Sequence, residues 1–198
     1  MLLNRLEYAL MNNPIRAAVQ RHFEAPKLFR MGGAMTAGVA LELGCGRGVG
    51  AELILQRFSA ARVDGFDLDP QMVVLARQRL RQHRERARFW VGDATAIAAR
   101  DAQYDAVFDF GILHHIPEWR AAIVEVRRVL APGGRFYAEE VLAPAVWLSR
   151  HFLKHPQTDR FDAAGFEAAL AQAGLTPIAR ANLGRSFAWF VAARPAAV

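Results

Sequence analysis

The sequence has little cysteine, little lysine and no long apolar run. Cys45 is the only cysteine among 198 residues, which excludes a disulfide framework and a zinc site built from several cysteines. No apolar run approaches the roughly 18 residues that a membrane-spanning helix needs. Arg5 and Glu7 interrupt the apolar N-terminal segment, which argues against a signal peptide. We therefore expect a cytoplasmic protein.

The net charge of +6 comes almost wholly from arginine, because only Lys27 and Lys154 of the 25 basic residues are lysines. Arginine suits phosphate recognition, so nucleic acid is one partner to weigh. Six arginines between residues 77 and 88 nevertheless spread around the polar side of an expected helix and the loop after it. That distribution is typical of a solvated face, and we disfavour nucleic acid as a partner.

Short apolar runs alternate with amphipathic stretches from Val39 onward, which predicts parallel strands joined by helices on both faces of a sheet. The expected strands are 39–43, 62–66, 88–91, 104–110 and 135–141, and the expected helices are 50–58, 70–82, 118–130 and 162–173. Two final strands, 175–182 and 186–193, are joined by a loop short enough only for a hairpin. The predicted fold class is α/β, a doubly wound and mostly parallel seven-stranded sheet with a C-terminal antiparallel hairpin.

The two flanking segments differ from this alternating middle. Residues 1–37 are expected to form a helical cap that Pro14 divides, and residues 38–198 a single domain with an insertion at 142–161. Segments 1–30 and 142–155 are apolar with scattered positive charge. They fit a cover over the active site, a subunit contact or a transient membrane-surface contact, and both a monomer and a homodimer stay open.

The first expected strand runs into a glycine-rich loop that spans Glu42 to Gly50 and reads ELGCGRGVG. Glycines let the backbone approach a ligand, and the helix that follows offers free amide donors. A dinucleotide fingerprint would need glycine at Val49, and the Gly-Lys-Ser/Thr sequence of an ATP-type loop is missing. Glu42 disfavours a phosphate and favours an ammonium group. The loop therefore predicts a ligand that carries a carboxylate and an amine.

Acidic residues also end the next two strands. Asp67 lies about twenty residues beyond the loop, where an acid accepts hydrogen bonds from a ribose diol. Asp93 ends the third strand, where it could accept from an exocyclic amine or simply cap a turn. An amino acid, a ribose and an amine-bearing base together describe S-adenosylmethionine.

These motifs resemble the class I S-adenosylmethionine-dependent methyltransferases, in particular their small-molecule branch, methyltransferase type 11. The resemblance covers roughly residues 38–140 and implies a Rossmann-like fold. It rests on blocks in the family's order, at Leu41–Gly50, Gly65–Asp67, Gly92–Ala94, Tyr104–Ile116 and Arg127–Glu140.

The resemblance also implies roles for individual residues. Glu42, Gly44, Gly46 and Gly48 would surround the methionyl part of the cofactor, with Cys45 as a small loop residue rather than a nucleophile. Asp67 would hold the ribose, and Leu68 would pack on the adenine. Asp93 and the backbone of Ala94 would read the adenine edge, and Phe110 would pass close to the sulfonium.

His115 and Glu140 are the candidate catalytic residues, and no metal is expected. Histidines at 114 and 115 are typical of the family, and one of them could instead pack over the cofactor. Glu139 and Glu140 point to opposite faces of their strand, and Glu140 is expected to face the cleft.

The expected function is in-line methyl transfer from S-adenosylmethionine to a small apolar, aromatic or lipid-like acceptor. The alternatives are an RNA methyltransferase, a non-catalytic cofactor-binding scaffold and a nicotinamide oxidoreductase, against which Val49 argues.

Overall fold

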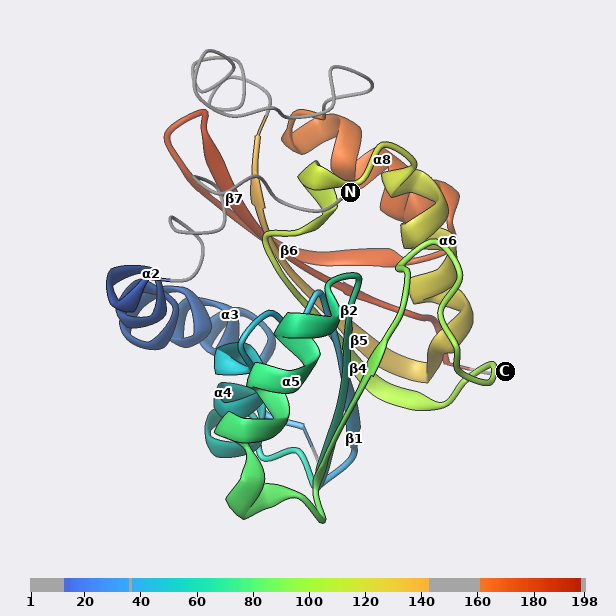
Figure 1. Cartoon of the computed structure of the whole chain (residues 1–198). Helices are drawn as coiled ribbons and strands as arrows, with labels where there is room; N and C mark the ends of the chain where they lie inside the picture. The colour runs from blue at the N-terminus through green and yellow to red at the C-terminus, as the bar shows by residue number, and fades with distance from the viewer. Residues whose placement is uncertain (1–12, 36, 143–160, 197–198) are drawn as a thin grey trace.

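The computed structural model describes residues 13–35, 37–142 and 161–196, which form a seven-stranded sheet in the order β3-β2-β1-β4-β5-β7-β6 (Figure 1). Strands β1 to β5 run parallel, whereas β7 is antiparallel to both β5 and β6. This arrangement confirms the predicted fold class. The strands are β1 Val39–Leu43, β2 Arg62–Asp67, β3 Ala87–Val91, β4 Tyr104–Phe110, β5 Leu130–Val141, β6 Thr176–Leu183 and β7 Phe187–Ala193.

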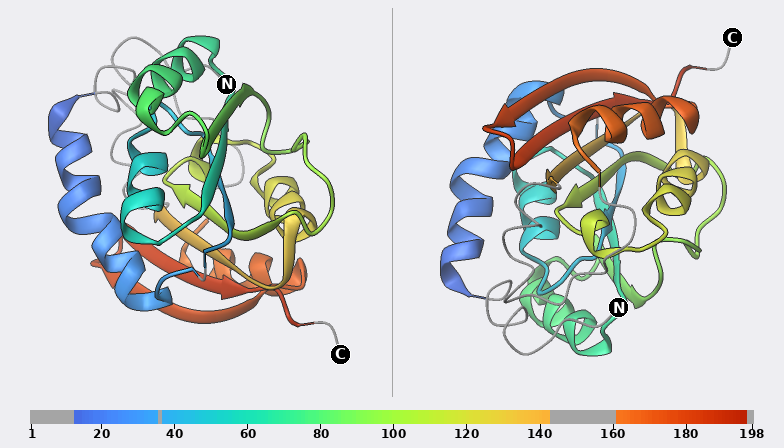
Figure 2. Two further views of the ribbon diagram at one scale, coloured as in Figure 1. Left: turned by 90° about the horizontal axis from the view of Figure 1, so that it is seen from below. Right: turned by 90° about the horizontal axis from the view of Figure 1, so that it is seen from above.

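Helices cover both faces of the sheet (Figure 2). The first core packs α3 (Ala25–Gly32), α4 (Val49–Arg57) and α5 (Pro70–Arg79) against one face. The second core packs α6 (Trp119–Val129) and α8 (Ala163–Gln172) against the other. Two short 3-10 turns, η2 (Arg81–His83) and η3 (Leu113–His115), lie between these elements. The central strands β1 and β4 are therefore buried on both sides, which explains their nearly continuous apolar runs, whereas β3 at the sheet edge is exposed at Arg88 and Val91.

Strand β4 shows how the sequence serves both cores. Val107 enters the core of α6, whereas Phe108 and Phe110 enter the core of α3 and α4. The ring of Phe108 stacks on Tyr137 at 4.6 Å between centroids and meets Phe58 edge-on at 4.7 Å. Aromatic pairs in these geometries contribute about 0.5–1.5 kcal/mol each beyond their buried area. This packing fixes the carboxyl end of β4, where the site lies.

The N-terminal helix differs from the prediction that Pro14 divides it. Pro14 instead opens α2 (Pro14–Val19), because proline is tolerated at a first helical position, and the Asn13 side chain accepts from Arg16 N at 2.8 Å. The helix continues through a π-helical turn, η1 (Gln20–Glu24), into α3. Residues 1–12 of the predicted cap and nearly all of the predicted insertion lie outside the described residues.

Within the described residues, no helix combines the length and the apolar character that crossing a bilayer requires.

Candidate active site

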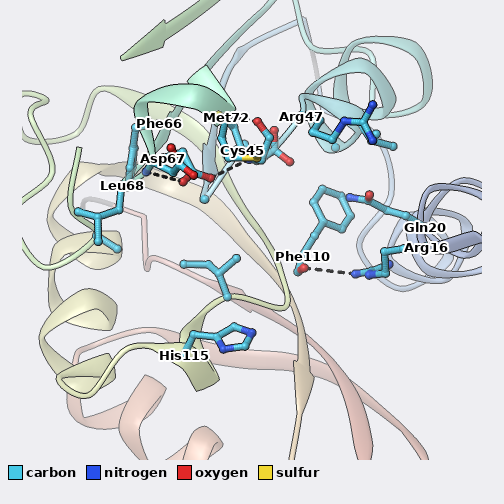
Figure 3. A pocket seen from close by; sticks show the side chains of 18 of the residues that line it. Arg16, Gln20, Cys45, Arg47, Phe66, Asp67, Leu68, Met72, Phe110 and His115 are labelled. Carbon is cyan, nitrogen blue, oxygen red and sulfur yellow. Dashed lines mark hydrogen bonds between the residues drawn. The ribbon is translucent and has the colours of Figure 1, made fainter. Parts of the chain in front are cut away.

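A cavity of about 590 Å³ lies at the carboxyl ends of β1, β2 and β4 (Figure 3). Its volume is within the usual range of small-molecule sites, roughly 300–1,000 Å³. Side chains of α2 and η1 line the wall opposite the glycine-rich loop. The predicted site residues that line the cavity are Glu42, Gly44, Cys45, Gly46, Asp67, Leu68, Asp93, Ala94, Phe110 and His115. Gly48 and Glu140 are not among the lining residues.

Asp67 is fixed across the glycine-rich loop. Its Oδ2 accepts a hydrogen bond from Gly46 N at 2.9 Å, and its Oδ1 accepts from Asp69 N at the same distance. Partial burial raises the pKa of the Asp67 carboxyl, and the two backbone donors counteract part of that shift. The carboxylate therefore stays beside the loop, where its remaining lone pairs are available to a ligand.

Each glycine of the loop is required for a different structural reason. Gly46 has φ +48°, and a Cβ there would meet nothing within 4 Å, so the loop leaves open space beside Asp67. At Gly44, with φ +57°, a Cβ would lie 2.7 Å from Ile112 Cγ2. Gly48, with φ +78°, caps α4 and packs against Ala76, away from the cavity. Gly48 therefore starts the helix, and its predicted place around the methionyl part of the cofactor stays a prediction.

Glu42 presents a buried carboxylate at the base of the loop. Its side chain is 2% exposed, and Oε2 has no hydrogen-bond partner among the described residues. A Cβ on Gly50 would lie 1.8 Å from Oε1, so only glycine leaves room for this acid. Burial raises the pKa of Glu42 well above its ordinary value, and the charges of Asp67 and Asp109 raise it further. An orphaned buried oxygen of this kind fits a cationic group of a ligand.

The third predicted acid has local partners. Asp93 is exposed at the cavity rim and accepts from both the N–H and the hydroxyl of Thr95 at 2.8 Å. These hydrogen bonds lower the pKa of Asp93. Leu68 is partly exposed nearby, and Ala94 is buried.

Arg16 joins the N-terminal helix to the end of β4, a contact that the sequence analysis missed. Its guanidinium donates to the Phe110 carbonyl at 3.4 Å (Figure 3). The same guanidinium forms an ion pair with Glu24. Glu139 Oε1 lies 3.8 Å from the same guanidinium. Burial and the neighbouring Glu24 raise the pKa of Glu139, and Arg16 opposes that shift. In the sequence, this cluster of Arg16, Glu24 and Glu139 is indicated only by Glu24, a single acid in an otherwise basic segment.

Glu140 lies beneath the η3 turn rather than in the cleft. Its Oε1 accepts from Leu113 N at 2.8 Å, and its Oε2 lies 2.7 Å from His114 Nδ1. Complete burial raises the pKa of Glu140 to about 7. Asp109, also buried, holds the same turn by accepting from Ile112 N at 2.9 Å. The two acids thus support the segment that carries His115.

His115 is the predicted catalytic residue that reaches the cavity. It follows His114, with 4.0 Å between the two ring centroids, and it lies across the cavity from Asp67 and Cys45 (Figure 3). Ile112 and Ile116, on either side of it in the chain, also line this wall. The cavity therefore has the buried Glu42 and the fixed Asp67 at the loop, whereas the wall at His115 carries Ile112, Ile116 and Pro117 together with the exposed Glu118.

Comparisons with known proteins agree with this geometry. Residues 40–134 match the model of a methyltransferase domain family. "Probable phthiotriol/phenolphthiotriol dimycocerosates methyltransferase 2" of Mycobacterium ulcerans is 31% identical over 143 residues, which are 72% of this chain and 48% of that protein. Demethylmenaquinone methyltransferase of Lactiplantibacillus plantarum is 32% identical over 141 residues, 69% of this chain and 59% of that protein. The chain thus spans about half the length of these relatives.

Among solved structures, geranyl diphosphate C-methyltransferase from Streptomyces coelicolor, in complex with Mg²⁺, geranyl-S-thiolodiphosphate and S-adenosyl-L-homocysteine, is similar with a TM-score of 0.73. The sequence identity is 19%, and the match covers 86% of this chain and 75% of that one. This likeness concerns the fold, whereas the sequence matches concern the family. Together with the glycine-rich loop and the acids at the strand ends, they show that residues 40–134 belong to a methyltransferase domain of the class I S-adenosylmethionine-dependent type.

Proposed function

We propose that the protein transfers the methyl group of S-adenosylmethionine to a small acceptor of lipid-like or quinone-like character. The observation that carries this proposal is a single cavity with two chemically different ends. The buried, unpartnered Glu42 oxygen and the fixed Asp67 carboxylate lie at one end. Ile112, Ile116 and His115 lie at the other. The names of the relatives, which specify complex lipids and a menaquinone precursor, support this acceptor class.

The residues at the acidic end fit the parts of the cofactor. Glu42 would pair with its ammonium group, and Asp67 would accept hydrogen bonds from its ribose hydroxyls. Leu68 would pack against the adenine. Asp93, which precedes Ala94, would accept a hydrogen bond from the adenine amine. Gly44, Cys45 and Gly46 would leave room for the methionyl chain. When bound, the cofactor supplies a methyl group on a positively charged sulfur.

The chain's own contribution is then orientation in a dry site. Phe110 lines the cavity between the loop and the N-terminal helix, and an aromatic face attracts a positive charge. The helix, held by Arg16, covers the side opposite the loop and excludes water there. Holding two reactants in line can contribute about 7–11 kcal/mol toward lowering the barrier.

His115 would accept the proton of a hydroxyl, amine or carbon acid, because its imidazole lines the wall formed with Ile112 and Ile116, and an imidazole can act as a general base. Glu140 does not reach the cavity, so we assign it a positioning role. It holds Leu113 N and His114, and thereby fixes the turn on which His115 lies.

Within residues 13–35, 37–142 and 161–196, the structure gives no observation that favours RNA as the acceptor. Several arginines of the 77–88 stretch are engaged within the fold. Arg79 donates to the Arg47 carbonyl at 2.9 Å, and Arg86 donates to the carbonyls of Ala60 and Ala61.

Incubation of the full chain with methyl-labelled S-adenosylmethionine and a total lipid extract tests the proposal. We expect labelled products in the lipid fraction by mass spectrometry, and much less label with the Asp67→Asn variant. Asp101→Asn is the matched control, because Asp101 does not line the cavity and is largely exposed. Label confined to an added RNA fraction, or present equally with both variants, would contradict the proposal.

A further inference from the structure

An apolar stripe runs along the solvent side of the N-terminal helix. Ile15, Val19 and Phe23 follow one another at intervals of four residues and are 74%, 41% and 46% exposed. Their neighbours along α2 and η1, among them Arg16 and Gln20, line the cavity, whereas these three do not. The helix therefore has the cavity on one side and an exposed apolar surface on the other.

The stripe continues onto the hairpin of β6 and β7, beside which the N-terminal helix lies (Figure 2). The ring of Phe23 meets Trp189 edge-on at 5.6 Å between centroids. Phe187 precedes Trp189 by two residues and so shares its face of β7, and Leu183 pairs with Phe187 across the hairpin. Both are exposed. We call Ile15, Val19, Phe23, Leu183 and Phe187 the apolar face.

The segments that carry the apolar face are almost free of acids. Within residues 13–33 and 176–196 the only acid is Glu24, which is buried and paired with Arg16. Lys27, Arg30 and Arg185 form no ion pair with any described residue. Arg21 and Arg180 of these segments pair with Glu52 and Glu167 of neighbouring helices. The net positive charge beside the apolar face therefore comes from Lys27, Arg30 and Arg185, and it is complementary to an anionic partner.

We propose that the apolar face binds the surface of a bilayer that contains anionic lipids. Exposed Phe, Val and Ile on one side of a helix insert into the boundary between head groups and acyl chains, and nearby Lys and Arg attract anionic head groups. Nucleic acid would use the cations and leave the apolar side chains in water. Because the same helix walls the cavity, binding there would bring the cavity to the membrane surface. The proposal goes beyond the proposed function and holds whichever acceptor is methylated.

Sedimentation of the full chain with vesicles tests this proposal. We expect binding to vesicles of phosphatidylcholine mixed with phosphatidylglycerol, weaker binding to phosphatidylcholine alone, and a loss of affinity as salt increases. Val19→Ser combined with Phe23→Ser should weaken binding by about tenfold or more, because two apolar side chains no longer leave water. Ile15→Ser gives a second readout, since Ile15 is too exposed for its loss to affect folding.

Val74→Ser combined with Val124→Ser is the matched control, because these valines are about as exposed but lie on α5 and α6. We expect the control to bind vesicles like the parent protein, and Arg185→Gln to reduce the salt dependence. Absence of binding to anionic vesicles would overturn the proposal, as would equal losses in the stripe and control variants. A stripe variant that changes the oligomeric state but not vesicle binding would instead identify the face as a contact between copies.

Discussion

The backbone N–H of Gly46 donates a hydrogen bond to Asp67 Oδ2 at 2.9 Å, which ties the loop after β1 to the end of β2. Gly46 reaches this position with φ +48°, in the region that favours glycine. The side chain of Asp67 is consequently held at the cavity by two backbone N–H groups, those of Gly46 and Asp69. The pair defines where the sugar of the proposed cofactor would lie.

Replacing Asp67 with Asn should weaken binding of S-adenosylhomocysteine. The amide keeps one oxygen for Gly46 or for the ribose but not for both, and hydrogen bonds to charged groups contribute about 1.5–3 kcal/mol. We therefore expect a loss of roughly tenfold to a hundredfold in affinity by isothermal titration calorimetry. Asp101→Asn should bind as the parent does. An unchanged affinity in Asp67→Asn would show that the ribose is held elsewhere.

Binding of the cofactor's ammonium group should release a proton from Glu42. Burial raises the pKa of Glu42 in the ligand-free protein, so the carboxyl stays protonated to higher pH than usual. A neighbouring ammonium favours the charged form and lowers that pKa. Calorimetry in buffers of different ionisation enthalpy should therefore detect proton release, which Glu42→Gln should abolish. Equal proton release in the two proteins would mean that another group titrates.

Glu140 should make the protein less stable as the pH rises toward neutrality. Its pKa is raised from 4.5 to about 7 by burial, so its contribution is fully present below about pH 4.5 and is lost as pH rises through about 7. A shift of this size corresponds to on the order of 3 kcal/mol. Asp109 and His114 face the same carboxylate, and burial raises the pKa of Asp109 as well, with the charge of Glu140 raising it further.

Urea unfolding at several pH values measures that effect. The decline between about pH 4.5 and 7 should be smaller in Glu140→Gln, which cannot ionise. Glu125→Gln is the opposite case, because Arg128 lowers the pKa of Glu125 and its contribution is lost only as pH falls. A decline that is unchanged in Glu140→Gln would assign the effect to other buried acids.

Loss of Arg16 should loosen the N-terminal helix. Glu24 and Glu139 would remain buried without their cation, and removal of one partner from a buried ion pair costs on the order of 3 kcal/mol. We expect Arg16→Ala to be destabilised by about that amount and to be cleaved faster by protease within residues 13–33. Arg30→Ala, an exposed position on the same helix, should stay within about 0.5 kcal/mol of the parent. Equal stability and equal cleavage rates in both variants would show that Arg16 does not hold the N-terminal helix in place.

The sheet and the end of the cavity that carries Glu42 and Asp67 follow from local sequence. Strands buried on both faces give continuous apolar runs, and glycines or acids directly after such runs must meet at one edge of a parallel sheet. This is why Asp67 and the loop could be placed together from sequence alone. The prediction for Pro14 was wrong because proline breaks a helix when it lies in the interior but is tolerated at the first turn, where Pro14 lies.

The surroundings of Glu139 and Glu140 could not be predicted in the same way. Alternation along β5 establishes that the two acids point to opposite faces, but not what covers each face. Glu140 is covered by the η3 turn, and Glu139 is covered by Arg16 and Glu24, which are more than a hundred residues away in the chain. Such long-range contacts leave no local pattern in the sequence.

Thermal unfolding of the full chain with added ligands shows whether the folded protein binds the product form of the proposed cofactor. A ligand that binds only the folded state raises the free energy of unfolding, by about 2.7 kcal/mol at a hundred times its dissociation constant. The account predicts a saturable rise in the unfolding temperature with S-adenosylhomocysteine and none with nicotinamide adenine dinucleotide. Stabilisation by the dinucleotide alone, or by neither ligand, would contradict the account.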